Sequence, residues 1–213
     1  GLGLEPGSAV ALQTPNRTAL ALTHLACDRA DLLFVPLSSA WRHREMSHLL
    51  QVSEAQVLIV PQRIKDGDYL AMVEDVRSDL PSLKHVGTLD GLAPGADFDF
   101  DAVSRRDSAL VSVDRDPNAP RFVMVTSGTT DLPRLSLWSD NNLWFFMQTF
   151  ISSVQLTEDD IAVGFCPANT GATGYVFAVL GPLLAGASSI LLEEWSPRSA
   201  LELIQGERAT TAT

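Results

Sequence analysis

The sequence of 213 residues has few cysteines, few positive charges and no long hydrophobic run. Its two cysteines, Cys27 and Cys166, lie far apart in apolar surroundings, which predicts reduced thiols in a cytoplasmic protein rather than a disulfide framework. The net charge of −11 argues against a nucleic-acid or anionic-membrane partner, because both require a basic face. No apolar stretch reaches the roughly 18 residues that span a bilayer, and the amino end lacks the basic and then apolar pattern of a secretory signal.

The chain also lacks the spacings of the common metal and nucleophile motifs. His43 and His48 are five residues apart, whereas metal ligands that share a helix face are three or four apart. There is no Gly-x-Ser-x-Gly segment, which counts against an unrelated α/β hydrolase or transferase. We therefore predict no metal site made of protein ligands.

Apolar runs of strand length alternate with amphipathic runs of helix length. Strands that are separated by helices of this size pair in parallel through right-handed crossovers, with helices covering the sheet. The pattern predicts an α/β fold of mostly parallel sheets wound with helices in layers. The expected strands are 8–13, 32–37, 56–60, 85–89, 122–125, 135–138, 161–165 and 189–192, and the expected helices are 19–28, 41–50, 69–80, 143–150, 175–184 and one beginning at Pro197.

One stretch interrupts this alternation. Residues 91–107 are rich in aspartate and glycine, which predicts an exposed loop with a solvated acidic face rather than a metal cage. It is the only plausible internal linker, and we expect it to separate residues 1–90 from residues 108–213.

A change of chemistry at residue 126 marks the candidate binding segment. The apolar run Phe122–Val125 gives way to Thr126, Ser127, Gly128, Thr129 and Thr130. Backbone N–H groups and hydroxyls at a strand end can donate hydrogen bonds to phosphate oxygens, so the segment predicts a polyphosphate loop. A Walker A loop is excluded because no lysine and Ser/Thr pair follows a second glycine. A polar surface turn is the alternative interpretation.

This segment resembles the phosphate loop of the acyl-adenylate-forming, or AMP-binding, enzymes, the family of AMP-forming acyl-CoA synthetases, luciferases and nonribosomal adenylation domains. The family reads T-S-G-T-T-G-x-P-K-G. Residues 126–130 and Pro133 match it, while Asp131, Arg134 and Leu135 replace a glycine, the lysine and the last glycine. Arg134 keeps a positive charge that can bind phosphate oxygens, whereas a carboxylate at Asp131 would repel a phosphate about 4 Å away by roughly 1 kcal/mol in water.

The resemblance covers essentially the whole chain and corresponds to the amino-terminal portion of the family's large domain. It implies ATP-dependent activation of a carboxylic acid to an acyl-adenylate and transfer to a thiol, with ATP and Mg²⁺ as cofactors, coenzyme A as the expected acceptor and fatty-acid metabolism as the setting. It also implies ATP phosphate-binding residues Thr126, Ser127, Gly128, Thr129, Thr130 and Arg134, and an acyl-substrate pocket at Thr170, Gly171 and Tyr175.

Two features leave alternatives open. The family often carries a histidine where this chain has Thr170, and Tyr175 with the apolar residues after it also fits ordinary core. The departures at Asp131, Leu135 and Thr170 together keep open a catalytically inactive binding or scaffold protein that retains the fold.

The family's remaining working parts are its Tyr-Gly-x-Thr-Glu segment, its ribose-binding aspartate and the lysine of its small domain, and none occurs before Thr213. We therefore expect an amino-terminal fragment without the carboxyl-terminal small domain, with no catalytic residue in this chain and no activity alone. The acyl substrate, the choice between coenzyme A and a carrier protein, and the oligomeric state, a homodimer included, stay open.

Overall fold

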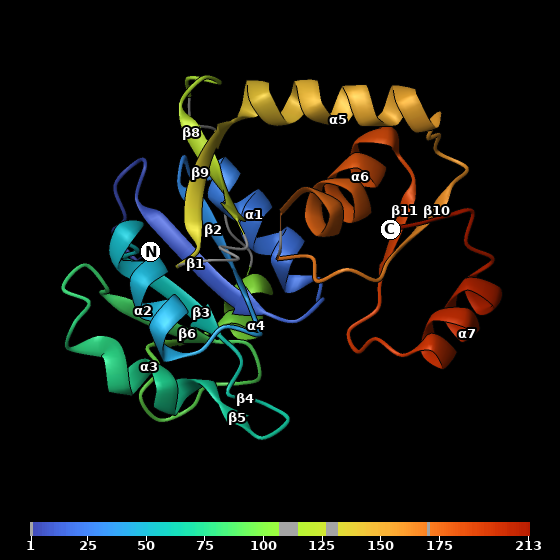
Figure 1. Ribbon diagram of the computed structural model, residues 1–213. Helices are drawn as coiled ribbons and strands as arrows, with labels where there is room; N and C mark the ends of the chain where they lie inside the picture. The colour runs from blue at the N-terminus through green and yellow to red at the C-terminus, as the bar shows by residue number, and fades with distance from the viewer. Residues whose placement is uncertain (1, 107–114, 127–131, 170) are drawn as a thin grey trace.

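The computed structural model describes residues 2–106, 115–126, 132–169 and 171–213, which form two main β-sheets with helices around them (Figure 1). The larger sheet has seven strands in the order β7-β6-β3-β1-β2-β8-β9, and the smaller has three in the order β11-β10-β12. Every pairing in these two sheets is parallel except the β8–β9 hairpin. The expected α/β fold of mostly parallel sheets is therefore confirmed.

The seven-stranded sheet is buried on both faces. In β1, residues at odd positions such as Ala9 and Ala11 contribute to one core, while Val10 and Leu12 contribute to the other. This alternation follows from the two-residue period of a strand and explains why the central strands are almost continuously apolar. The strands are β1 (Ala9–Thr14), β2 (Leu33–Ser38), β3 (Val57–Val60), β6 (His85–Thr88), β7 (Phe98–Asp99), β8 (Pro120–Thr126) and β9 (Arg134–Ser139).

Helices cover the two faces of this sheet. On one face, α2 (His43–Val52) and α3 (Tyr69–Arg77) bury Met46, Leu49 and Met72 against the strands. On the other face, α1 (Ala19–Arg29) packs together with the helical segment η1 (Ala172–Leu180) from the second half of the chain. A short hairpin of β4 (Arg63–Ile64) and β5 (Gly67–Asp68) lies outside both sheets.

The stretch 91–107, expected to be a loop, contains strand β7 and helix α4 (Phe100–Ser104), so that expectation was wrong in part. β7 joins the sheet because Phe98 lies over Gly87, where a Cβ atom would approach the phenylalanine ring to 2.3 Å. The sheet takes strands from both sides of this stretch, and the division into residues 1–90 and 108–213 stays a prediction.

Helix α5 (Asp140–Val154) connects the two sheets, running from the β8–β9 hairpin across to α6 (Figure 1). Ser139 caps it by accepting a hydrogen bond from the Asn142 N–H at 3.3 Å. No described helix is long and apolar enough to cross a membrane. The remaining elements are β10 (Ile161–Gly164), α6 (Gly181–Ala185), β11 (Ser188–Leu191), α7 (Pro197–Glu207) and β12 (Thr211–Ala212).

The helix expected at 175–184 begins earlier and has two parts, the wide π-helical segment η1 and then α6. Gly174 explains why the chain packs so closely here, because a Cβ atom at this position would lie 2.1 Å from the Pro167 carbonyl oxygen. The backbone of η1 therefore lies directly on the segment that leaves β10.

We expect Gly174→Ala to lower the free energy of unfolding by about 2 kcal/mol or more, because the added methyl group overlaps a backbone oxygen. Gly206→Ala in α7 is the matched control, since no other part of the described structure comes within 4 Å of its Cβ position. It should be neutral or stabilise the protein by up to about 1 kcal/mol. Urea denaturation measures both, and equal stability of the two variants would contradict the close contact at Gly174.

Candidate functional site

The candidate site lies where the parallel strands end at their carboxyl edge. Strand β8 ends at Thr126 and β9 begins at Arg134, so these two residues face each other at the base of the hairpin. The Thr126 hydroxyl accepts a hydrogen bond from the Arg134 N–H and donates one to the Arg134 carbonyl oxygen, each at 3.4 Å. Ligands of open α/β sheets bind at this edge. Ser127, Gly128, Thr129, Thr130 and Asp131 lie outside the described residues.

Arg134 is available to an anion. Arg134 is exposed, and its side chain forms no ion pair with any described residue. Helix α2 supports the same arm of the hairpin, because His48 Nε2 lies 3.2 Å from the Pro133 carbonyl oxygen. The guanidinium thus extends from an anchored strand at the edge where the sequence predicts phosphate binding.

A second part of the predicted site lies at the start of η1. Gly171 has φ of 72° and ψ of −150°, a backbone conformation that residues with a Cβ atom rarely adopt. No atom of the described residues beyond its chain neighbours lies within 4 Å of its Cβ position, so a ligand can approach the backbone there. Thr170 is outside the described residues.

Tyr175 lies in the core, with 1% of its surface exposed. Its hydroxyl is 3.0 Å from His24 Nδ1, and its ring stacks on Phe122 at a centroid distance of 5.5 Å. Burial raises the pKa of Tyr175 well above its usual value, so the hydroxyl keeps its proton. The role of Tyr175 in an acyl pocket stays a prediction, and any effect on a substrate would come through the position of η1.

Sequence reasoning missed two asparagines that join the two sheets. The Asn16 Nδ2 donates to the carbonyl oxygens of Cys166 at 2.9 Å and Leu192 at 3.0 Å, and its Oδ1 accepts from the Ala168 N–H at 2.6 Å. Asn169 donates in return to the Thr14 carbonyl oxygen at 2.6 Å. The available signal was that each asparagine lies one or two residues after a proline in the loop that follows a strand.

These contacts place the carboxyl ends of β1, β2, β10 and β11 around one cleft of about 400 Å³. The cleft offers amide, hydroxyl and thiol groups together with an indole ring, a mixture suited to a substrate with polar and apolar parts. No described group of three or more histidine, cysteine, aspartate or glutamate side chains could hold a metal ion. The cleft is lined by Pro15, Asn16, Ser39, Phe165, Cys166, Pro167, Asn169, Leu192, Glu193 and Trp195.

The cysteines have no catalytic arrangement in the described structure. Both are free thiols, Cys27 buried and Cys166 at the cleft. Burial raises the pKa of Cys27 to about 12, which keeps this thiol protonated and unreactive.

We expect Asn16→Ala to lower the free energy of unfolding by about 2 to 4 kcal/mol, because it leaves two carbonyl oxygens and one N–H without their partner. Asn118→Ala is the matched control, since Asn118 is exposed and should change stability by less than about 0.5 kcal/mol. Chemical denaturation compares the two variants. A cost for Asn16→Ala no larger than the control would show that the sheets are held together by other contacts.

The buried His24 should make the stability of the protein depend on pH. Burial lowers its pKa to about 4, with Asp28 raising it and Arg115 lowering it further. Between pH 6.5 and 4 the unfolded chain binds this proton and the folded chain does not, so stability falls as the pH falls. The loss should reach roughly 2 to 3 kcal/mol. The double variant His24→Phe/Tyr175→Phe keeps two aromatic rings but removes the imidazole and its hydroxyl partner. Urea titrations at pH 7 and pH 4.5 should show a smaller loss of unfolding free energy in this variant than in the wild type. An equal loss in both proteins would contradict the buried neutral imidazole.

The family model described as AMP-binding enzyme matches residues 1–213. The chain is 28% identical over 211 residues to the medium-chain fatty-acid–CoA ligase of Escherichia coli (strain K12), covering 98% of this chain and 37% of the ligase. It is 28% identical over 227 residues to the 2-hydroxy-7-methoxy-5-methyl-1-naphthoate–CoA ligase of Streptomyces carzinostaticus, covering 100% of this chain and 40% of that ligase.

The fold is similar to that of Mycobacterium smegmatis MbtA, with a TM-score of 0.89 and 26% identity over 100% of this chain and 39% of MbtA. The chain spans about two fifths of the length of these curated relatives. Since the family model matches the chain from its first residue to its last, the chain belongs to the AMP-binding enzyme family.

Proposed function

We propose that the protein of which this chain is a part activates a carboxylic acid with ATP and passes the resulting acyl group to a thiol, with coenzyme A as the acceptor. The substrate carboxylate attacks the α-phosphorus of ATP, the bond to the β-phosphate oxygen breaks, and pyrophosphate leaves. The thiol then displaces AMP from the acyl-adenylate to give a thioester. The observation that carries the proposal is the exposed Arg134 facing Thr126 at the base of the β8–β9 hairpin, at the carboxyl edge of a parallel sheet.

In this proposal the chain contributes charge and position rather than a nucleophile. Phosphoryl and adenylyl transfers depend mainly on orientation and on neutralising the charge that develops on the phosphates. Arg134 supplies a cation without an ion pair to the described residues, and the hydroxyls of Ser127, Thr129 and Thr130 would donate to the β- and γ-phosphates. Asp131 opposes this binding unless its carboxylate points away from the nucleotide.

The proposed acyl site lies at the start of η1, where Thr170 and Gly171 precede the helix. Support comes from the open space beside the Gly171 backbone and from the neighbouring cleft between the two sheets. Tyr175 would fix the orientation of η1 through its contact with His24. The relatives named above are CoA ligases for a fatty acid and for an aromatic acid, which supports an organic acid as the substrate class.

The 213 residues alone are proposed to be inactive. The segments that the family uses for adenine, ribose and the small-domain lysine are not in this sequence, so the intermediate would lack most of its contacts. The complete protein is therefore the object of the functional test.

We expect Arg134→Ala in the complete protein to weaken Mg-ATP binding about tenfold, because a charge-assisted contact to phosphate is lost. Arg134→Lys should retain most of the affinity, since it keeps the charge. Arg198→Ala is the matched control, because Arg198 lies in α7 with 88% of its side chain exposed. Calorimetric ATP titration and carboxylate-dependent exchange of pyrophosphate into ATP measure the two steps.

The outcomes separate the two candidate functions. Exchange that depends on an organic acid supports the ligase. ATP binding by neither the wild type nor its variants would instead support the inactive scaffold that the changes at Asp131 and Leu135 leave open.

A further inference from the structure

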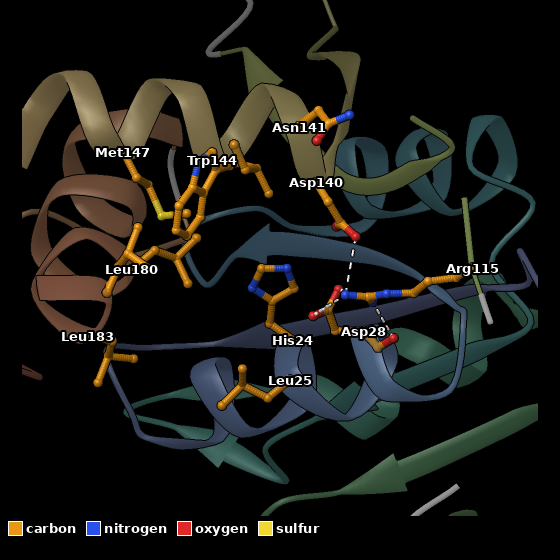
Figure 2. Close-up of a pocket in the computed structure, with 12 residues that line it drawn as sticks. His24, Leu25, Asp28, Arg115, Asp140, Asn141, Trp144, Met147, Leu180 and Leu183 are labelled. Atoms are coloured by element: carbon orange, nitrogen blue, oxygen red, sulfur yellow. Dashed lines mark hydrogen bonds and ion pairs between the residues drawn. The ribbon is translucent and has the colours of Figure 1, made fainter. Parts of the chain in front are cut away.

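A second cavity lies at the opposite edge of the seven-stranded sheet from the candidate nucleotide site. It has a volume of about 470 Å³ and lies between α1, α5 and α6 (Figure 2). Arg29 ends α1 shortly before β2 begins, and Asp140 begins α5 beside the amino end of β8. The cavity is thus at the amino ends of the strands, whereas Thr126 and Arg134 lie at their carboxyl ends. Its volume falls within the range of small-molecule sites, which is roughly 300 to 1,000 Å³.

The cavity has one apolar end and one charged end. Figure 2 shows Trp144 and Met147 of α5 with Leu180 and Leu183 on the apolar side, and Asp28 and Asp140 on either side of Arg115 on the other. Arg115 lies 2.6 Å from an Asp28 carboxylate oxygen and 3.2 Å from one of Asp140. Two carboxylates facing one guanidinium leave a net charge of −1 at this end. The other lining residues are His24, Leu25, Asn141, Leu143 and Leu184.

His24 lies between the two ends, and its surroundings determine which nitrogen carries the proton. One face of the ring stacks on Phe34 at a centroid distance of 5.2 Å, and Nδ1 meets the Tyr175 hydroxyl at 3.0 Å. No other hydrogen bond of this hydroxyl involves a described residue, and a buried hydroxyl proton without an acceptor is costly. Tyr175 therefore donates to Nδ1, and the neutral imidazole carries its proton on Nε2.

The Nε2–H group is a hydrogen-bond donor at the cavity wall. No described residue accepts a hydrogen bond from it, and 7% of the His24 surface is exposed. Burial lowers the pKa of His24 to about 4, so the ring does not become cationic near neutral pH. The cavity thus offers one N–H donor beside the acceptor oxygens of Asp28, one turn along the same face of α1.

We propose that this cavity binds a small uncharged alcohol or phenol, a ligand site separate from the nucleotide site. The ligand's hydroxyl oxygen accepts from His24 Nε2–H and its proton goes to an Asp28 carboxylate oxygen, while its apolar body lies on Trp144, Met147 and Leu180. A hydroxyl matches this pair because it accepts and donates at once. A carboxylate does not match it, because the charged end already carries a net negative charge.

The test uses the complete protein and para-propylphenol as the probe, measured by calorimetry in the presence and absence of saturating Mg-ATP. Propylbenzene, which lacks the hydroxyl, and para-propylbenzoate, which replaces it by a carboxylate, should each bind about tenfold more weakly. Mg-ATP should leave the phenol affinity unchanged. Equal binding of the three compounds, or displacement of the phenol by Mg-ATP, would overturn the proposal.

Variants of two neighbouring residues of α5 test where the phenol binds. Trp144 lines the cavity with 53% of its surface exposed, whereas Phe145 is 73% exposed and is not among the lining residues. Trp144→Ala should weaken phenol binding about fivefold through the lost aromatic contact, while Phe145→Ala should change it less than about twofold. Both side chains are on the surface, so neither variant should impair folding. Similar affinities of the two variants would place the phenol elsewhere and refute the site.

Discussion

The side-chain amide of Asn16 is the contact on which the arrangement of the two sheets depends. It lies at the end of β1, is 6% exposed, and hydrogen-bonds to both loops that leave the smaller sheet after β10 and β11. Asn169 makes the reciprocal contact to Thr14. Because buried carbonyl and N–H groups require partners, these bonds hold the carboxyl edges of both sheets around one cleft.

Close backbone approach is the second constraint, and glycine provides it. Gly174 allows η1 to lie on the segment after β10. Gly164 allows β10 to approach η1, because a Cβ atom at this position would lie only 2.8 Å from the Ala178 Cβ atom. Between these glycine contacts and the stacking of Tyr175 on Phe122, η1 is packed on both sides. One helical segment thereby contacts the proposed acyl site at its start and the second cavity at Leu180.

Ion pairing distinguishes the arginines that stabilise the fold from Arg134, which is proposed to bind phosphate. Arg121 is 6% exposed and pairs with Asp31, while Arg115 holds Asp28 and Asp140 together. These buried or half-buried pairs fix the amino edge of the sheet, because breaking one would leave an uncompensated charge. Arg134 at the opposite edge forms no such pair with the described residues, so its charge is available to an anion. In a chain with a net charge of −11, that exposed cation provides local attraction for a polyphosphate.

The sequence by itself determined the α/β class, the long strands and helices and the family, because hydrophobic period and an ordered motif are local properties. The short elements β4, β5, β7, β12 and α4 were not predicted. Sequence reasoning failed where distant residues decide the outcome. Phe98 lies in a strand where Gly87 leaves room for its ring, and Asn16 donates to carbonyl groups 150 and 176 residues away along the chain. The placement of Tyr175 against His24, and the cavity beside them, likewise arise from packing between α1 and η1. No local sequence pattern predicts such contacts, because the two partners are far apart along the chain and meet only in the folded protein.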